Sequence, residues 1–549
     1  MFSSTLLIHP NDNVVVALTS LEAGATVQVG DASYTLRNRI PPKHKFAARD
    51  FAPGDPIHMY GGLVGRAQTA IPKGSLLTTS NVTHAATGFS EQRHAYTWTP
   101  PDVSRWATAT FEGYHRTDGQ VGTQNVWLVV PLVFCENRNV QTLQAALAET
   151  LGYAPRPVYQ AYAERLATAH RAGASIADLD ALAFEVRSTE RQARLFPNVD
   201  GLKVLTHHSG CGESRADSET LCALLAGYLN HPNIAGATVL SLGCQNAQVK
   251  VLEQVLADRY PHFNKPLHIF DQQQIGVEQT LVSEALKKTF LGVAEANRIE
   301  REPAPLSHLT FGMECGGSDG FSGLSANPAM GHTADLLVAL GGKVLLSEFP
   351  ELCGVEQQLI DRCVDTATAA RFIAIQRAYA ARAERDGFGF DMNPSPGNIK
   401  DGLITDAMKS AGAAKKGGTA PVADVLDYTE PATKSGLSLL CTPGNDVEST
   451  TGLAGSGANI IFFSTGLGTP TGNPVAPVIK VASNTALAQR MPDVIDMDTG
   501  AIIRGEQTVE TMGEQLLDLA IEVASGRRTT RAMDLGQDDF IPWKRGISL

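Results

Sequence analysis

The sequence lacks long apolar runs. No segment reaches the roughly 18 consecutive apolar residues from which a membrane-spanning helix is recognised, and the first ten residues have neither the basic start nor the apolar stretch of a secretion signal. We therefore expect no membrane partner and a cytoplasmic location.

Clusters of basic residues are also missing. The formal net charge is −12 at pH 7, and no stripe of lysine or arginine interrupts the acidic balance. Because such a chain repels phosphate backbones, we expect no nucleic-acid partner. No G-x-x-x-x-G-K-[ST] loop and no H-E-x-x-H helix motif is present, which argues against the commonest nucleoside-triphosphatase and zinc-protease interpretations.

Cysteine is scarce, with eight residues in 549. In a long chain without a secretion signal, these are better explained as reduced thiols than as a disulfide framework. Four of them nevertheless follow strand-like apolar runs, in the segments 126–135, 202–211, 237–244 and 309–315. Because the carboxyl ends of parallel strands share one edge of a sheet, these thiols could converge on a soft-ligand metal site.

The pattern of turns and apolar residues divides the chain into three parts joined by a linker. Residues 1–88 show short alternating strands between glycine and proline turns, and residues 89–108 form the linker. Residues 109–303 and 304–549 alternate strands with amphipathic helices, which is typical of α/β domains with mainly parallel sheets. A helical insertion is expected around 150–196, packed on the outside of the first α/β domain.

Glycine-rich turns are frequent in the second α/β region, at 315–323, 393–398, 442–446 and 464–470. Successive backbone N–H groups in such turns form concavities that hold carboxylate or phosphate oxygens. The sequence therefore favours an anionic small molecule as ligand.

Several of these segments together resemble the altronate/galactarate dehydratase family. The resemblance rests on residues 312–328, with 393–398, 463–466, the 111–125 segment and the turns that contain Cys211 and Cys244. It implies an amino-terminal β-clip domain of the SAF type over the first 85 residues, with signatures at His9 and His44. The turn at 442–446, residues 347–351 and the ending 546–549 are most similar to the altronate branch.

The resemblance also implies a reaction. Such enzymes eliminate water from a sugar acid to give a 2-keto-3-deoxy acid, with iron or manganese as cofactor. The expected partners are a small sugar-acid substrate, D-altronate above all, and further copies of the chain in a homo-oligomer. Galactarate or another acidic hydroxy acid is the alternative substrate, and a non-catalytic sugar-acid-binding protein on the same fold is the alternative function.

The metal ligands can be chosen in two ways. Cys211, Cys244 and Cys315 lie in glycine turns and could hold an iron–sulfur cluster, since thiolates favour iron–sulfur chemistry. Cys135 has no adjacent glycine and is set apart from them. The rival is a mononuclear ferrous or manganous site that uses His9, His44 and His207.

The catalytic and substrate-binding candidates come from the same motifs. We expect His207 as the base, because a neutral imidazole titrates near working pH, with Glu314 or Asp319 as its acid or orienting partner. Hydroxyl and carboxylate contacts of the substrate are expected from Ser318, Asn327, Ser395, Asn398, Asn445, Thr465 and Lys480.

Three positions depart from the family pattern. Leu467 stands where an arginine is expected, Thr471 where an aromatic residue is expected, and Ser209 where a tyrosine is expected. Because an arginine would clamp a carboxylate through two hydrogen bonds, another cation has to replace it. Lys480 and Arg138 are the candidates.

Overall fold

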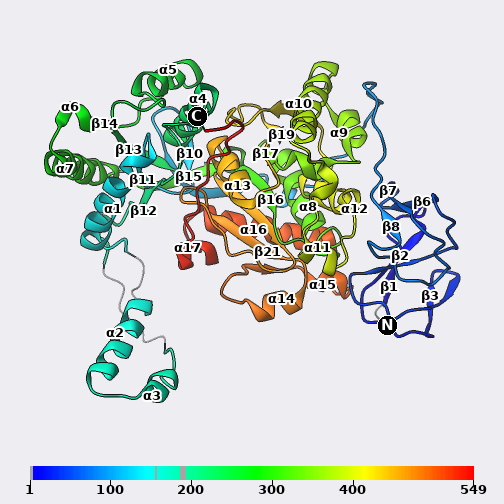
Figure 1. Ribbon diagram of the computed structural model, residues 1–549. Helices are drawn as coiled ribbons and strands as arrows, with labels where there is room; N and C mark the ends of the chain where they lie inside the picture. Colours follow the sequence, from blue (N-terminus) through cyan, green and yellow to red (C-terminus); the bar gives the residue numbers. More distant parts are fainter. Residues whose placement is uncertain (1–3, 155–157, 186–192, 549) are drawn as a thin grey trace.

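The computed structural model describes residues 4–154, 158–185 and 193–548. Figure 1 shows a small β unit at one end of the molecule, a large α/β unit in the middle and a smaller α/β unit at the other end. The predicted fold class is confirmed, because a small β domain precedes two α/β regions that are each built on a parallel sheet.

The amino-terminal β unit consists of short antiparallel strands in three small sheets, ordered β1-β2-β5, β3-β4 and β6-β7-β8. Its strands are β1 (Thr5–Leu6), β2 (Val14–Ala17), β3 (Thr26–Val29), β4 (Ala32–Thr35), β5 (Lys45–Ala47), β6 (Pro56–Met59), β7 (Gly62–Ala67) and β8 (Val82–Thr83). One of its two apolar cores continues into the central unit through Phe321, Leu324 and Met408. Burial of this shared apolar surface holds the two units together.

The linker is anchored along the central unit. It contains a single short helix, η1 (Ser104–Trp106), and the indole Nε1 of Trp106 donates to Asp518 at 2.9 Å. Trp98 donates in the same way to Thr419 at 3.1 Å. The linker then enters a small antiparallel sheet of order β10-β9-β15, made of β9 (Thr110–His115), β10 (Val121–Gly122) and β15 (Arg301–Pro305). The expected boundary at 303 therefore falls inside β15.

The smaller α/β unit is a four-stranded parallel sheet of order β12-β11-β13-β14. Its strands are β11 (Val126–Pro131), β12 (Gly201–Val204), β13 (Ile234–Ser241) and β14 (Leu267–Asp271). Its helices are η2 (Phe134–Glu136), α1 (Asn137–Leu151), α4 (Arg215–Asn230), α5 (Val249–Arg259), α6 (Gln272–Ile275) and α7 (Glu278–Ala296). The indole of Trp127 is fully buried between β11 and α7, where a Cβ on Gly292 would lie 2.0 Å from the ring.

The insertion is helical but does not pack as expected. It contains α2 (Val158–Arg171) and α3 (Ile176–Asp180), and none of the residues of these two helices is buried. Figure 1 shows both helices projecting away from the sheet that carries α1. Exposed apolar side chains include Tyr159 and Ile176, at 74% and 78% relative exposure. The expectation of helices packed on the outside of the domain was wrong for these residues.

The central unit is a seven-stranded parallel sheet of order β18-β19-β17-β16-β20-β21-β22. Its strands are β16 (Thr310–Cys315), β17 (Lys343–Leu346), β18 (Val422–Leu426), β19 (Gly436–Leu440), β20 (Ile460–Thr465), β21 (Val478–Ala482) and β22 (Met497–Asp498). Its α-helices are α8 (Ala326–Ala339), α9 (Glu356–Arg362), α10 (Thr366–Arg385), α11 (Pro396–Lys400), α12 (Asp406–Ala413), α13 (Asp446–Gly455), α14 (Thr485–Arg490), α15 (Gly500–Ile503), α16 (Val509–Ala524) and α17 (Arg531–Leu535). Short helices η3 (Leu306–His308), η4 (Phe349–Leu352), η5 (Phe390–Met392) and η6 (Ala414–Gly417) complete it.

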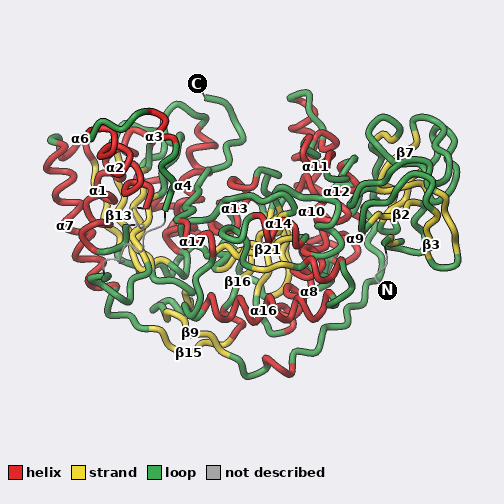
Figure 2. Tube along the Cα trace, turned by 90° about the horizontal axis from the view of Figure 1, so that it is seen from below, coloured by secondary structure: helices red, strands yellow, loops and turns green. Residues whose placement is uncertain are grey.

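Helices cover both faces of this central sheet. On one face α8 and α16 pack in the core that contains Phe311 and Phe462, and on the other face α13 packs in the core that contains Ile461 and Phe463. Figure 2 shows the three units side by side, with the small β9-β15 sheet on the lower edge. Within the described residues no helix is long and apolar enough to cross a membrane.

Candidate active site

The strand order places a topological switch between β16 and β20. From β16 the chain goes to β17 on one side of it, whereas from β19 it crosses to β20 on the other side. In doubly wound sheets, ligands bind outside the carboxyl ends of the strands at such a point. The two loops that flank the switch are the glycine turns after Cys315 and after Thr465.

These two loops are bonded to each other through their backbones. Gly316 donates to the carbonyl of Ser464 at 3.0 Å, and Gly466 donates to the carbonyl of Gly317 at 3.0 Å. Gly317 has a φ of +59°, which a residue with a side chain adopts only with strain. These two glycine turns therefore meet at the carboxyl edge of the central sheet.

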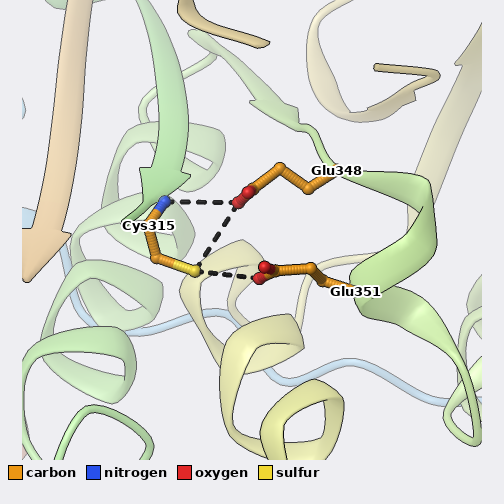
Figure 3. A group of neighbouring side chains, drawn as sticks. All are labelled: Cys315, Glu348 and Glu351. Carbon is orange, nitrogen blue, oxygen red and sulfur yellow. Dashed lines mark hydrogen bonds between the residues drawn. The ribbon is translucent and has the colours of Figure 1, made fainter. Parts of the chain in front are cut away.

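Below this edge lies a group of five buried side chains that we call the buried charge cluster: Cys315, Glu348, Glu351, Lys409 and Lys416. The Nζ of Lys416 lies 2.5 Å from Oε2 of Glu348 and 3.0 Å from Sγ of Cys315, whose thiol also lies 3.1 Å from Oε2 of Glu351. Figure 3 shows Cys315 between the two carboxylates. Lys409 binds the other oxygen of Glu351 at 2.6 Å.

Each lysine of the cluster neutralises a carboxylate. The neighbouring carboxylates raise the pKa of Lys409 and Lys416 despite burial, so both stay charged. Burial, with help from Glu348 and Glu351, raises the pKa of the Cys315 thiol well above its usual range. The thiol is therefore neutral and donates to Glu351. Glu348 holds a left-handed backbone conformation with a φ of 67°, a strain that the surrounding structure must hold in place.

A metal ion does not fit this cluster. Cys315, Glu348 and Glu351 offer ligand atoms that lie within 4.8 Å of one another, and they are the only such group of three in the described residues. The ammonium of Lys416, however, already contacts Glu348 and Cys315 from the position that a cation would take. An ion there would displace a buried positive charge whose carboxylate partners, among the described residues, are Glu348 and Glu351 alone.

Glu314, one of the predicted acid–base residues, lies next to this cluster on β16. Its Oε2 accepts from the hydroxyls of Ser347 at 2.8 Å and Ser449 at 2.6 Å, and its Oε1 has no hydrogen-bond partner in the described structure. Burial and the charge of Glu348 raise the pKa of this carboxyl well above its usual range. Glu314 is fully buried, and its surroundings favour the protonated form of the carboxyl.

Asp319, the other predicted acid–base residue, is a structural anchor. Its carboxylate accepts from Ser483 at 2.8 Å and Asn484 at 3.0 Å, and it pairs with Lys43 of the β unit at 2.9 Å. Lys43 also pairs with Asp401 at 2.7 Å. Asp319 is completely buried and thereby fixes the amino-terminal unit against the glycine turn.

A cleft of about 410 Å³ opens directly above this anchor. Its walls come from the β unit, from the glycine turn after β20 and from the amino-terminal end of α14. The residues that the argument uses are Lys43, Asp401, Leu467, Asn484 and Arg490. Arg490 is exposed, its guanidinium donates to the carbonyl of Leu467 at 3.1 Å, and no described carboxylate lies within 4.0 Å of it.

Arg490 therefore supplies a cation at the turn where Leu467 replaces the expected arginine. Neither of the cations proposed from the sequence, Arg138 and Lys480, lies at this turn. Arg138 lies in the smaller α/β unit, paired with Glu278. Lys480 is completely buried beside the ring of Phe463, with its Nζ 3.5 Å from the ring centroid and no hydrogen-bond partner in the described structure.

Most predicted substrate contacts hold the loops in place. Asn398 caps α11 together with Ser395 and donates to the carbonyl of Ser318 at 2.7 Å. Asn327 links Ser464 to the carbonyl of Gly412. Thr465 caps the glycine turn by accepting from Gly468, and Asn445 caps α13. The structure gathers Ser318, Ser395, Asn398 and Thr465 around the switch-point loops, as backbone supports.

The predicted histidines are dispersed. His207 is buried with Nε2 bonded to the carbonyl of Pro131 at 2.7 Å and Nδ1 accepting from Ser209, and burial lowers its pKa to about 4. It is a neutral structural residue rather than a free base. His9 and His44 lie in the β unit, and neither belongs to a described group of three ligand atoms. The rival histidine set is therefore not brought together.

The predicted cysteine set is divided between the two parallel sheets. Cys315 ends β16 in the central sheet, whereas Cys211 and Cys244 follow β12 and β13 in the smaller sheet. Cys135 follows β11, the strand that lies between β12 and β13.

Asp446 is a charged residue of the switch region to which the sequence assigned no role. It begins α13, and its Oδ2 would lie 2.0 Å from a Cβ added to Gly316. Burial, with the charges of Glu348 and Glu351, raises its pKa to about 7. The turn at 442–446 was recognised as a motif, but only the fold shows that its aspartate contacts the switch-point loop.

Comparison with known proteins covers all three units. Residues 3–85 match the altronate/galactarate dehydratase SAF domain, residues 113–297 match the second domain of D-galactarate dehydratase/altronate hydrolase, and residues 306–548 match the D-galactarate/altronate dehydratase carboxyl-terminal domain.

Three full-length relatives agree with these matches. The chain is 32% identical to an altronate dehydratase of Escherichia coli over 99% of both chains, and 32% identical to an altronate dehydratase of Bacillus subtilis over 95% of both. It is 31% identical to an Escherichia coli galactarate dehydratase (L-threo-forming), over 95% of this chain and 93% of the relative. The chain therefore belongs to the altronate/galactarate dehydratase family of sugar-acid dehydratases.

Proposed function

We propose that this protein eliminates water from D-altronate to give 2-keto-3-deoxy-D-gluconate. The observation that carries the proposal is the cleft at the switch point, where Arg490 lies on the turn at Leu467 and pairs with none of the described carboxylates. A planar guanidinium binds a carboxylate through two parallel hydrogen bonds. The similarity to two altronate dehydratases supports altronate, although an almost equal identity to a galactarate dehydratase keeps galactarate as the alternative.

The reaction removes the proton next to the carboxylate and expels a hydroxide from the neighbouring carbon. Negative charge develops on the substrate carboxylate as the proton leaves, and a positioned cation stabilises that charge. Lys43, whose ammonium lies on the cleft wall, keeps its positive charge because Asp319 and Asp401 raise its pKa. Arg490 and Lys43 would then hold the acid end of the substrate.

His44 is the group that we assign to accept the proton. It directly follows Lys43, a residue of the cleft wall, in the sequence, and burial lowers its pKa, so its imidazole is neutral near pH 7. The Nδ1 atom lies 3.1 Å from the carbonyl of Pro42, which makes Nδ1 the donor and leaves Nε2 as the basic nitrogen. His44 was considered from the sequence only as a metal ligand.

Iron dependence is part of the same proposal, and it rests on the family resemblance. When bound, a divalent iron would act as a Lewis acid for the departing hydroxyl. We also propose a cytoplasmic homo-oligomer. The exposed apolar side chains of the α2–α3 insertion, Tyr159 and Ile176 among them, support self-association.

The test is a substrate panel. Protein purified without oxygen and supplied with ferrous iron is incubated with altronate, galactarate and gluconate, and the 2-keto-3-deoxy product is quantified. Fastest turnover of altronate is the expected result. Faster turnover of galactarate would move the assignment to the alternative substrate. Thermal stabilisation by these acids without any keto acid would identify a binding protein instead.

A further inference from the structure

Three cysteines converge at the carboxyl edge of the smaller parallel sheet. Cys135 follows β11, Cys211 follows β12 and Cys244 follows β13, and these are adjacent strands with β11 in the middle. We call these residues the thiol triad. Its members are exposed or half-exposed, whereas four of the other five cysteines are buried.

Hydrogen bonds tie the three loops together. Phe134, next to Cys135, donates its backbone N–H to the carbonyl of Ser209 at 3.1 Å. The side chain of Asn246 donates to the carbonyl of Cys211 at 2.5 Å, so the loop of Cys244 is bonded to the loop of Cys211. The positions of the triad are thus set by adjacent strands and by direct bonds between their loops.

A glycine makes the close approach possible. Gly210 has a φ of +103°, and a Cβ on it would lie 2.2 Å from the carbonyl oxygen of Leu132. Any larger residue would push the Cys211 turn away from the segment that leads to Cys135.

The spacing distinguishes the kind of group that the triad would bind. The three Sγ atoms do not form a group within 4.8 Å of one another. A single tetrahedral ion with bonds of about 2.3 Å would hold its sulfurs about 4 Å apart. A cluster in which irons and sulfides lie between the thiolates spans a wider gap, and thiolates are its usual ligands.

The surroundings fit a cluster as well. The side-chain amide of Gln273 donates to Sγ of Cys244 at 3.2 Å, and hydrogen bonds to the sulfurs tune such clusters. In contrast to the buried charge cluster, no lysine or arginine of the described residues is hydrogen-bonded to a triad sulfur. No buried cation would have to be displaced.

We propose that Cys135, Cys211 and Cys244 bind an iron–sulfur cluster through three thiolates, with one iron of the cluster not held by cysteine. The proposed site lies in a different sheet from the substrate cleft. It requires neither D-altronate as the substrate nor any turnover.

The test measures iron and acid-labile sulfide per chain in protein purified and reconstituted without oxygen, together with visible absorption and electron paramagnetic resonance. The expected result is several irons with equal sulfide in the wild type, and loss of at least two thirds of both in Cys135→Ser, Cys211→Ser and Cys244→Ser. Cys222→Ala and Cys315→Ala are the controls, and both should keep the cluster.

Circular dichroism shows whether each variant is folded, so that loss of the cluster is not confused with loss of structure. Iron without sulfide, a single bound zinc, or a disulfide within the triad in the anaerobic protein would overturn the proposal. A cluster that survives in Cys135→Ser but is lost in folded Cys315→Ala would return the ligand set to Cys211, Cys244 and Cys315. Failure of the reconstituted wild type to hold iron and sulfide would overturn only this site and would leave the proposed function to be tested by turnover.

Discussion

The ammonium of Lys416 lies 3.0 Å from the sulfur of Cys315 and binds Glu348, in a part of the protein with almost no solvent access. This contact shows that the position of Cys315 is already occupied by a charge interaction. A cysteine at the end of a central strand has the position of a metal ligand, yet its neighbour is a fixed positive charge. Cys315 therefore belongs to a charge network that holds the carboxyl edge of the sheet.

Replacement of Lys416 by methionine should strongly destabilise the protein. The change would leave Glu348 buried without its partner, and breaking one side of a buried ion pair typically costs about 3–5 kcal/mol. Chemical denaturation measures the loss. An unchanged free energy of unfolding would show that Glu348 becomes protonated at little cost.

Lys480→Met should have the opposite effect, because Lys480 is buried with no hydrogen-bond partner among the described residues and burial lowers its pKa to about 7. Between pH 7 and the ordinary lysine pKa, the Lys480 amine binds a proton more readily in the unfolded chain than in the folded one. The variant should therefore gain the most stability below about pH 7 and lose the gain as the pH rises toward 10. Thermal melts at about pH 6 and about pH 9 measure this; equal gains at both would contradict it.

Asp446→Asn tests the raised pKa of about 7 at the switch point. In the wild type, the folded state keeps the proton to a higher pH than the unfolded state, so stability falls as the pH rises from about 4 to about 7. The variant should match the wild type near pH 4 and exceed it above pH 7. Melting temperatures across this range are the measurement, and a wild-type advantage at high pH would show that the ionised aspartate is stabilised instead.

His207→Gln should reduce stability but preserve the pH dependence of turnover. Both ring nitrogens are bonded to the backbone, and burial lowers the pKa to about 4, so the imidazole does not titrate near neutral pH. Rates are normalised to folded protein and compared across pH. Loss of one limb of the pH–rate profile would restore His207 as the base, and the same loss in His44→Gln is what the proposed function requires.

Arg490→Gln should raise KM for the sugar acid at least tenfold, since about 1.4 kcal/mol of binding corresponds to a factor of ten and a charged hydrogen bond contributes at least that much. Arg385→Gln, which changes another exposed arginine, is the matched control. An unchanged KM in Arg490→Gln would remove this residue from the substrate site.

The strands and glycine turns at the carboxyl edge of the central sheet could be predicted, because they depend on local sequence patterns. Apolar strands followed by glycine turns indicated parallel strands, and parallel strands bring their carboxyl ends to one edge. The sequence predicted glycine turns after Cys315 and Thr465, and the structure bonds these two turns to each other. It also predicted that strand-end thiols share a sheet edge, and the structure places Cys135, Cys211 and Cys244 after adjacent strands. Cys135 was left out of the predicted ligand set only because no glycine adjoins it. The glycine that allows the Cys135 and Cys211 segments to approach each other is Gly210, in the loop that contains Cys211.

The remainder depends on pairings that are distant in sequence. Both sheets have the same strand-and-turn pattern, so nothing near Cys315 shows that it joins a different sheet from Cys211. Lys416 lies about 100 residues from Cys315, and its lysine type gives no sign of burial. His207 was judged as a free imidazole because a sequence shows neither the burial nor the two backbone bonds that fix it.

The most direct test of the proposed function is proton NMR of altronate incubated with the iron-loaded protein in heavy water. Elimination followed by ketonisation places one solvent deuteron on the third carbon. The account predicts 2-keto-3-deoxygluconate that carries one proton and one deuterium at that position. Unchanged altronate, or a product without deuterium there, would contradict it.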